Sequence, residues 1–327
     1  MSEPTNVGTT PPRAPTRTPS LAHRLEYGAL RSMIGVLGAM RWRRAVRAGA
    51  ALGRLAYQPL GVRRDVVESQ IAAAFPEASD REVRAMARGA FEHLGRVTVE
   101  TALLSRVDPA WVYDLFEVVE GWDTVERLRA QGRGLIMVTG HLGNWELGGA
   151  YIAARGVPLD VVVRRMGNPL FDGYLTRTRS RLGMAVVRDR DAVRRAPRTL
   201  RGGGAVAFLT DQAGLNLAST FVPFFGRPAK TPRGPAVFAL RLEAPVVFGT
   251  ALRLANGRYR LVFEEVPVLS TGDREKDVDQ LVVSYTRILE RWVREAPEQY
   301  FWQHRRWKRQ PEDTPEALRD PVEASRG

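Results

Sequence analysis

Short apolar runs alternate with amphipathic stretches over most of the chain. The run from Leu135 to Val138 is wholly apolar and glycines bracket the residues after it, which is typical of a buried strand leading into a tight turn and a helix. Further strands are predicted at residues 116–119, 159–163, 185–187, 205–209, 246–252 and 259–266, and helices at 122–131, 147–154, 171–182, 192–200, a segment ending at 242, and 275–295. A strand–helix–strand order with short links predicts parallel pairing with right-handed crossovers. We therefore predict an α/β fold, a single domain whose mixed, largely parallel central sheet is flanked by helices.

A long helix is predicted to begin after Ser79. The sequence Ser79-Asp-Arg-Glu82 has the capping-box pattern, and apolar residues then recur at helical spacing as far as Leu104. His93 lies beside this apolar stripe, and we interpret it as a structural residue.

The N-terminal region is basic. Residues 1–20 are rich in Pro and Thr and lack the apolar core of a signal peptide, so we predict a disordered tail. Residues 1–64 hold eleven Arg and no Lys against two Glu. The apolar run 32–40 is too short to span a bilayer. We predict that segment 21–64 forms a basic amphipathic helix that associates with an anionic membrane surface, with an ordinary helix packed on the domain as the alternative.

The chain shows no internal repeat and no obvious linker. We therefore expect one domain over residues 21–310, made of the basic segment 21–64 and a main part 65–310, followed by a C-terminal tail at 311–327.

Composition excludes several kinds of site. Cysteine is absent, which excludes disulfides, thiolate metal ligands and a cysteine nucleophile. The His-Glu-x-x-His, Gly-x-Gly-x-x-Gly and P-loop patterns are also missing, so we expect no zinc, dinucleotide or nucleoside-triphosphate site. The net charge of +13 is compatible with nucleic acid, an anionic membrane or an acidic protein as partner, and charge alone does not choose among them.

The candidate chemistry follows the central strand. His141 lies in the turn and Glu146 five residues later, a spacing that does not share one face of a straight helix. If His141 precedes the helix and Glu146 lies in its first two turns, the carboxylate can bend back to the imidazole. That would place a base and its orienting acid at the carboxyl end of a strand, where open α/β sheets bind ligands. The alternative is that His141 caps the helix and Glu146 is solvated.

The residues of this turn carry a resemblance to a known family. The stretch His141-Leu-Gly-Asn-Trp-Glu146 resembles the His-x4-Asp/Glu motif of the lysophospholipid acyltransferase superfamily, most closely its lipid A late acyltransferase branch. Further blocks match that branch in order over about residues 80–310: Arg164 with Asn168-Pro-Leu170, Asp211-Gln212, Phe221-Val-Pro-Phe-Phe225, and Pro297-Glu-Gln-Tyr300 through His304-Arg-Arg306. The chain departs from the family pattern at Arg165, where a proline is common, and in its weakly apolar N-terminal region.

The resemblance implies an acyltransferase at the cytoplasmic face of the bacterial inner membrane, with residues 65–310 as the acyltransferase domain. It implies a donor that is an acyl–acyl carrier protein or acyl-CoA thioester, and an acceptor hydroxyl on a glycolipid such as a lipid A precursor. We expect no cofactor besides the acyl thioester, no metal and no nucleic acid. His141 and Glu146 would be catalytic. Because the chain lacks both Cys and a Gly-x-Ser-x-Gly elbow, direct attack by the acceptor hydroxyl, with His141 as general base, is the simplest mechanism.

Four further residues are predicted to bind substrate: Arg164, Asp211, Asn144 and Gly143. Arg164 would bind an anionic substrate, or share with the turn amides near Gly143 the stabilisation of an oxyanion; a surface ion pair is its alternative. Asp211 would position Arg164 or the acceptor, or else cap a helix. The block 221–225 either lines the acyl chain or belongs to the core, and the block 304–308 is structural or faces phosphate.

Three rival functions remain open from the sequence. The acceptor could be a phosphatidylinositol mannoside or a lysophospholipid. The same scaffold could act as an esterase that releases free fatty acid. A basic nucleic-acid-binding protein is also conceivable, using the arginines and aromatic residues of block 300–307.

Overall fold

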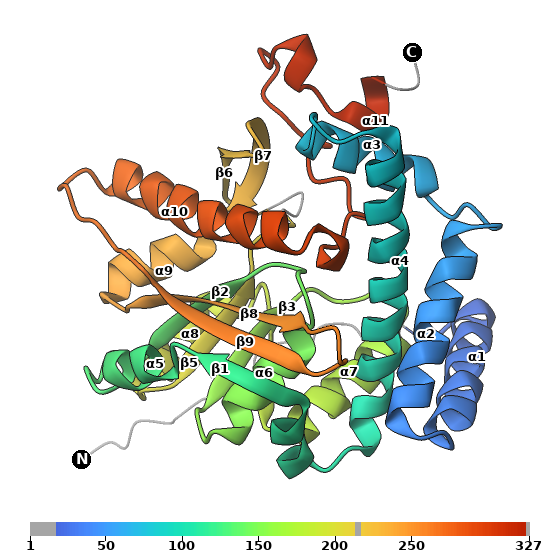
Figure 1. Ribbon diagram of the computed structural model, residues 1–327. Helices are drawn as coiled ribbons and strands as arrows, with labels where there is room; N and C mark the ends of the chain where they lie inside the picture. The colour runs from blue at the N-terminus through green and yellow to red at the C-terminus, as the bar shows by residue number, and fades with distance from the viewer. Residues whose placement is uncertain (1–17, 213–216, 325–327) are drawn as a thin grey trace.

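The computed structural model describes residues 18–212 and 217–324. Its centre is a seven-stranded sheet with the strand order β1-β9-β8-β2-β5-β3-β4 (Figure 1). Strands β8, β2, β5, β3 and β4 run parallel, whereas β9 is antiparallel to β8 and carries β1 in parallel on its other side. The strands are β1 (Phe116–Glu120), β2 (Leu135–Thr139), β3 (Leu159–Val163), β4 (Met184–Arg188), β5 (Ala205–Leu209), β8 (Val246–Arg253) and β9 (Tyr259–Val266). The predicted mixed, largely parallel α/β sheet is confirmed.

Strand β2 explains why the sheet is covered on both faces. Leu135 and Met137 pack into one core, with β9 and the helices α5 (Trp122–Arg129) and α6 (Trp145–Ala154). Ile136 and Val138 pack into a second core on the opposite face. Because successive side chains of a strand point to opposite faces, a wholly apolar strand requires two such layers.

The second core is formed by helices that follow later strands. These helices are α8 (Ala192–Arg201), α9 (Gly234–Leu242) and α10 (Arg274–Glu295). In Figure 1, α9 and α10 lie above the sheet, and α5 and α6 lie below it. The remaining helix between strands is α7 (Pro169–Arg181), which connects β3 to β4.

In the described part of the chain, four helices precede the sheet. They are α1 (Leu21–Gly38), α2 (Trp42–Tyr57), α3 (Arg64–Ala74) and α4 (Asp80–Leu103), and short 3-10 turns η1 (Leu104–Arg106) and η2 (Pro109–Leu115) lead from α4 to β1. The predicted capping box is confirmed: Glu82 N–H donates to Ser79 Oγ at 3.4 Å, and Ser79 N–H donates to Glu82 Oε2 at 2.8 Å. The long helix α4 stands upright at the carboxyl edge of the parallel strands (Figure 1).

The predicted N-terminal helix is present, but the basic segment forms two helices rather than one. The chain breaks after Gly38 and resumes helix at Trp42, so two helices form. Helix α2 packs closely on α4. The backbones approach so closely that a Cβ at Gly49 would collide with the backbone of Gly95, and a Cβ at Gly53 with that of Phe91. The predicted tail 1–20 lies outside the described residues except for 18–20, of which Ser20 caps α1. Within the described part, we find no helix long and apolar enough to cross a membrane.

A hairpin and a packed C-terminal segment complete the fold. The hairpin strands β6 (Ser219–Phe224) and β7 (Arg227–Pro232) form a separate antiparallel pair beside α10. After α10 come η3 (Pro297–Gln299), η4 (Glu316–Leu318) and α11 (Pro321–Ala324), and α11 contacts α3.

Candidate active site

The site is built on the turn between β2 and α6. The turn backbone is tightly held: Gly143 has a φ of +60°, and a Cβ there would overlap the carbonyl oxygen of Ala251. A Cβ at Gly140 would likewise press on Leu289. Glycine is therefore required at position 143, whereas at position 140 the Leu289 side chain would have to shift; the turn projects His141 at the carboxyl edge of the sheet.

His141 is held by Asp211. The imidazole Nδ1 lies 2.8 Å from Asp211 Oδ1, and the His141 backbone N–H donates to Asp211 Oδ2 at 2.9 Å. Because an ionised carboxylate only accepts, Nδ1 carries the proton and Nε2 presents a lone pair. The ring also contacts Trp145 edge-on, with centroids 4.7 Å apart.

Asp211 is ionised in this environment. Its side chain is 2% exposed. Burial raises the pKa of this carboxyl group, but attraction to His141 and the hydrogen bonds from its ring and backbone outweigh burial and hold the pKa well below the ordinary value. A buried carboxylate fixed to an imidazole is the arrangement that stabilises an imidazolium when the ring accepts a proton.

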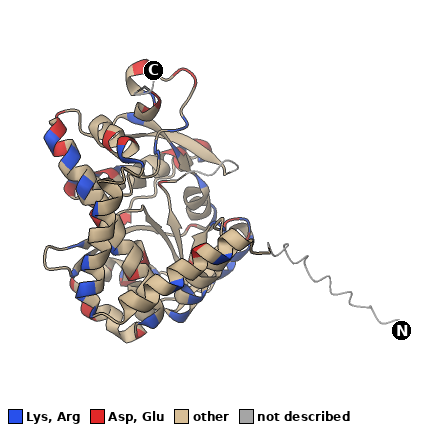
Figure 2. Cartoon of the chain, turned by 90° about the vertical axis from the view of Figure 1, so that its right-hand side faces the viewer, with Lys and Arg blue, Asp and Glu red and all other residues tan. Residues whose placement is uncertain are grey.

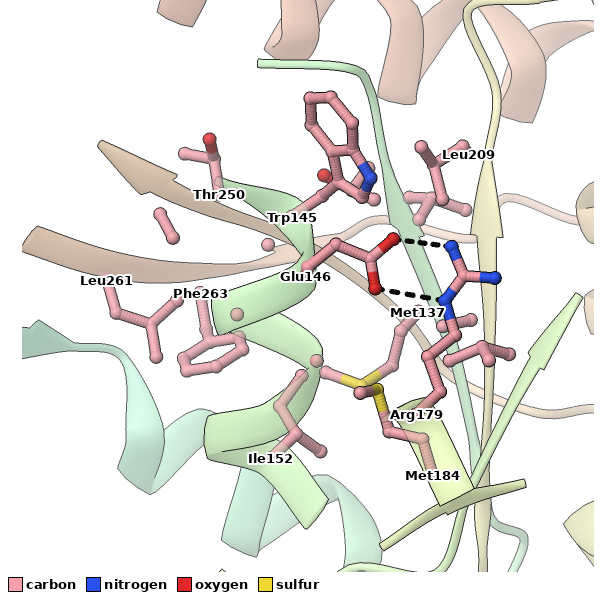
Figure 3. A pocket seen from close by; sticks show the side chains of 18 of the residues that line it. Met137, Trp145, Glu146, Ile152, Arg179, Met184, Leu209, Thr250, Leu261 and Phe263 are labelled. Carbon is pink, nitrogen blue, oxygen red and sulfur yellow. Dashed lines mark hydrogen bonds and ion pairs between the residues drawn. The ribbon is translucent and has the colours of Figure 1, made fainter. Parts of the chain in front are cut away.

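The prediction that Glu146 orients His141 is wrong. Glu146 is the second residue of α6, and its carboxylate is bonded to Arg179 of α7, with Nε to Oε2 at 2.9 Å and Nη2 to Oε1 at 2.5 Å (Figure 3). The orienting acid comes instead from a neighbouring strand. Thr139 pairs with Leu209, so the residues two positions beyond each, His141 and Asp211, meet at the sheet edge.

The Glu146–Arg179 pair is buried. The side chains are 8% and 17% exposed, respectively. Burial lowers the pKa of Arg179, but the charge of Glu146 and the hydrogen bonds to it outweigh burial and raise the pKa overall. From the sequence, Arg179 is only one of several arginines on a predicted helix. Arginines stand at positions 177, 179 and 181, and the sequence gives no signal that singles out Arg179 among them.

An apolar cavity opens beside this pair. It has a volume of about 70 Å³ and lies between α6 and the sheet (Figure 3). Trp145, which touches His141, forms part of its wall, so the cavity adjoins the His141–Asp211 pair. The other lining residues are largely aliphatic, small or aromatic: Met137, Val138, Thr139, Gly148, Gly149, Ile152, Val161, Val163, Met184, Ala207, Leu209, Gly249, Thr250, Ala251, Leu261 and Phe263, together with Glu146 and Arg179.

Asn144 and Gly143 hold the turn in place. Asn144 is fully buried; its Oδ1 accepts from Leu147 N–H at 3.1 Å and its Nδ2 donates to Glu100 at 2.9 Å. Gly143 N–H donates to Gln299 O at 3.0 Å. The Gly143 amide is therefore already bonded inside the protein, and the prediction that it stabilises an oxyanion does not fit this geometry.

A buried imidazole supports the same turn from α4. His93 Nε2 lies 3.0 Å from Gly143 O, and burial lowers the pKa of His93 to about 3, so the ring is neutral and donates this hydrogen bond. The predicted structural role of His93 agrees with this position.

Arg164 lies at the same edge as the His141–Asp211 pair. It follows the last residue of β3, which pairs with β5, and its side chain is exposed with no acidic partner among the described residues. The alternative of a surface ion pair is thus not seen. Asp211 neither positions Arg164 nor caps a helix in this structure, because both of its oxygens are bonded to His141.

The later sequence blocks are largely structural. Phe224 and Phe225 lie in the core, while Phe221 is exposed on the hairpin, and none of them lines the cavity. Arg306 is buried and donates to Lys230 O and Thr231 Oγ1, each at 2.6 Å. Burial lowers the pKa of His304 to about 4. Within the described residues, no group of three His, Asp or Glu could hold a metal ion.

Comparison with known proteins decides the family. The sequence model of the bacterial lipid A biosynthesis acyltransferases matches residues 22–309. The chain belongs to this family. It is 31% identical to the lipid A biosynthesis palmitoleoyltransferase of Escherichia coli (strain K12) over 266 residues, which cover 80% of this chain and 84% of the relative.

Further relatives agree on acyl transfer. The lipid A biosynthesis lauroyltransferase of Escherichia coli (strain K12) is 29% identical over 271 residues, covering 82% of this chain and 87% of the relative. A phosphatidylinositol mannoside acyltransferase of Mycobacterium tuberculosis (strain ATCC 25618 / H37Rv) is 26% identical over only 138 residues, or 41% of this chain and 43% of the relative. The protein is therefore an acyltransferase of the lipid A type, and its family implies an acyl donor and a glycolipid acceptor.

Proposed function

We propose that the protein transfers a fatty acyl group from an acyl–acyl carrier protein thioester to a hydroxyl of a lipid A precursor, with His141 as the general base and Asp211 as the residue that orients it. The observation that carries this proposal is the His141–Asp211 pair beside an apolar cavity at the carboxyl edge of the sheet. A base next to a space for a hydrocarbon chain is what direct acyl transfer to an alcohol requires.

The positions of the protons on His141 and Asp211 support His141 as the base. Nδ1 keeps its proton and donates it in a hydrogen bond to Asp211, so Nε2 is free to take the proton of the acceptor hydroxyl as the hydroxyl oxygen attacks the thioester carbonyl. The C–S bond then breaks, and the imidazolium returns its proton to the leaving thiolate. Asp211 stabilises the imidazolium throughout, because its carboxylate stays ionised. The reaction needs no metal and no cofactor other than the thioester.

The cavity would hold the acyl chain. Its walls are apolar except for Thr139, Thr250 and the Glu146–Arg179 pair, which is closed on itself by two hydrogen bonds. Each methylene that leaves water contributes about 0.8 kcal/mol, so a cavity of this kind selects long acyl chains over short ones.

The oxyanion of the tetrahedral intermediate needs a donor. The Trp145 and Glu146 backbone N–H groups lie in the first turn of α6 and have no acceptor among the described residues. The Arg164 guanidinium, which also has no acidic partner there, is the second candidate. One such donor is typically worth about 3–4 kcal/mol of transition-state stabilisation.

The N-terminal helices would bind the membrane surface, at the cytoplasmic face of the bacterial inner membrane. Leu21 and Leu25 of α1 are 73% and 67% exposed, and α2 exposes Leu52 and Leu55. Arg43, Arg44 and Arg47 are exposed on α2 as well. Figure 2 looks onto this side, where basic positions are interspersed along largely uncharged helices. Leucines that enter the headgroup region beside arginines that meet anionic lipids suit peripheral attachment.

Mass spectrometry of cellular lipids tests the proposal. Removal of the gene is expected to leave a lipid A species that lacks one acyl group, and the wild-type gene to restore it. The His141→Ala gene is expected not to restore it at equal protein level. An unchanged lipid A after gene removal, with changed phosphatidylinositol mannosides or phospholipids, would assign the acyltransferase to a different acceptor.

A further inference from the structure

Helix α8 and the turn before it carry several exposed arginines that form no ion pair among the described residues. The segment 188–202 holds six Arg and two Asp. Arg188 is bonded to Asp172 and Arg195 to Asp160. The other four, Arg190, Arg194, Arg198 and Arg201, are exposed, and none has an acidic partner among the described residues.

Three of these arginines share one face of α8, and Arg190 lies in the turn that precedes the helix. Arg194, Arg198 and Arg201 are spaced by four and three residues, which keeps them on one side of the helix. The opposite side, Ala192, Ala196 and Leu200, is buried against the sheet. From Arg194 to Arg201 the row extends about 10 Å along the helix axis. It is therefore an elongated basic stripe on a rigid element, longer than a single phosphate group needs.

The stripe begins at the edge that carries the candidate active site. Helix α8 follows β4, and Asp189 N–H donates to Val163 O at 3.2 Å, so the segment entering α8 lies against the end of β3. Arg164 follows directly. Since β3 pairs with β5, the basic residues continue outward from the strand end that bears Asp211.

The stripe differs from the surface of α1 and α2. Apart from Val193, which is 65% exposed, α8 exposes no large hydrophobic residue that could enter a lipid layer, whereas α1 and α2 expose several leucines. Figure 1 also places α8 well to the left of α1 and α2. Arginine is enriched at protein–protein interfaces, and a row of arginines beside one apolar side chain offers little that could insert into a lipid layer.

We propose that the α8 stripe, Arg190, Arg194, Arg198 and Arg201 with Val193, docks the acidic protein that carries the acyl thioester. This inference rests on the proposed function, because it assumes a protein-borne donor. A row of carboxylates on the carrier would meet the row of guanidiniums, and docking there would bring the thioester to the sheet edge at which His141 lies.

The test compares two charge-reversed double variants. Arg194→Glu/Arg198→Glu reverses the stripe. Arg274→Glu/Arg287→Glu on α10 is the control, since both of its arginines are exposed without an acidic partner among the described residues and the net charge changes equally. Acyl transfer is measured with lauroyl–acyl carrier protein and an acylated glucosamine lipid, and thermal unfolding checks that both variants fold.

The stripe variant is expected to raise the KM for lauroyl–acyl carrier protein at least about tenfold, with the KM for the lipid unchanged and a weaker dependence of rate on salt. The control variant should match the wild type. Equal KM values in both variants would overturn the docking proposal. So would loss of binding to phosphatidylglycerol vesicles in the stripe variant with an unchanged donor KM, because the stripe would then be a lipid surface.

The two proposals fail in different ways. If the proposed function is wrong, the wild-type protein transfers no acyl group from the carrier in this assay. If only the docking surface is wrong, transfer occurs and the stripe variant behaves like the control. Binding of holo-acyl carrier protein to the His141→Ala protein, with and without the stripe substitutions, measures docking independently of turnover; equal binding would also overturn the docking proposal.

Discussion

Replacing Asp211 with Asn exchanges one carboxylate oxygen for an NH2 group. The site then loses both the negative charge beside His141 and one of the two acceptors that hold it. Asp211 accepts two hydrogen bonds from His141, at 2.8 Å from the ring and at 2.9 Å from the backbone. An amide offers one acceptor and one donor. If its oxygen faces the ring, its NH2 opposes the buried His141 N–H; if its NH2 faces the ring, Nδ1 must be the acceptor and Nε2 then carries the proton.

Both orientations are costly. The first leaves a buried N–H without an acceptor, which costs about 1–3 kcal/mol, and removes the charge that stabilises the imidazolium. The second abolishes the base outright. In the Ser-His-Asp enzymes the same substitution lowers kcat by about 10⁴, because the tautomer is wrong. We expect a fall of about 10³–10⁴ in kcat for Asp211→Asn, equivalent to about 4–5.5 kcal/mol.

The matched control is Asp277→Asn. Asp277 is also a buried carboxylate with two close donors, the N–H and Oγ1 of Thr271, and it lies on α10 outside the cavity. This variant is expected to lose stability but to keep its kcat. Initial rates at saturating donor and acceptor, with thermal unfolding alongside, compare the two variants. An Asp211→Asn enzyme that retained more than about a tenth of the wild-type kcat would refute the role assigned to Asp211.

Three other consequences of the structure can be measured. Arg179→Met leaves the Glu146 carboxylate buried without its partner, so the free energy of unfolding should fall by about 3–5 kcal/mol. The double variant Glu146→Gln/Arg179→Met should recover part of this free energy. Ile152→Trp puts a larger side chain into the wall of the cavity; if two methylenes are excluded, kcat/KM for a long acyl chain should fall about 15-fold relative to a chain two carbons shorter. The pKa of His93 is about 3 in the folded protein, below its ordinary value of 6.5. As the pH falls, the unfolded chain therefore binds a proton at His93 that the folded protein excludes. Lowering the pH from 7.5 to 5.5 should reduce the free energy of unfolding by about 1.4 kcal/mol through this imidazole.

Each of these expectations has a contrary result. If Glu146→Gln/Arg179→Met is no more stable than Arg179→Met, the unpaired Glu146 charge is not the cause of the lost stability. An unchanged ratio of rates for the two acyl lengths in Ile152→Trp would place the acyl chain outside this cavity. A pH dependence of unfolding that is the same in His93→Gln as in the wild type would remove His93 as its source.

The sheet was predictable because the local sequence of its strands indicates both their burial and their pairing. The wholly apolar Leu135–Val138 run requires layers on both faces, and the short links require parallel pairing. The break between α1 and α2 was missed because apolar and basic residues continue through it. Strands β6 and β7 were missed because prolines interrupt an otherwise strand-like pattern.

The site was predictable in part. His141 was found from its turn, but its acid partner was assigned to the nearest carboxylate in the chain. The true partner lies 70 residues away, and only the register of β2 against β5 brings Asp211 to the imidazole. The partner of Glu146 depends in the same way on how α7 packs. Contacts between strands and helices far apart in sequence are set by tertiary packing, which a local pattern does not contain.

The most direct test of the account is the mass of the acceptor lipid after incubation of purified protein with lauroyl–acyl carrier protein and an acylated glucosamine lipid. The proposed function predicts that the wild-type protein adds one lauroyl group to the lipid, and that a folded His141→Ala protein adds none. Equal product from the His141→Ala protein, or free lauric acid as the sole product of the wild-type protein, would contradict it.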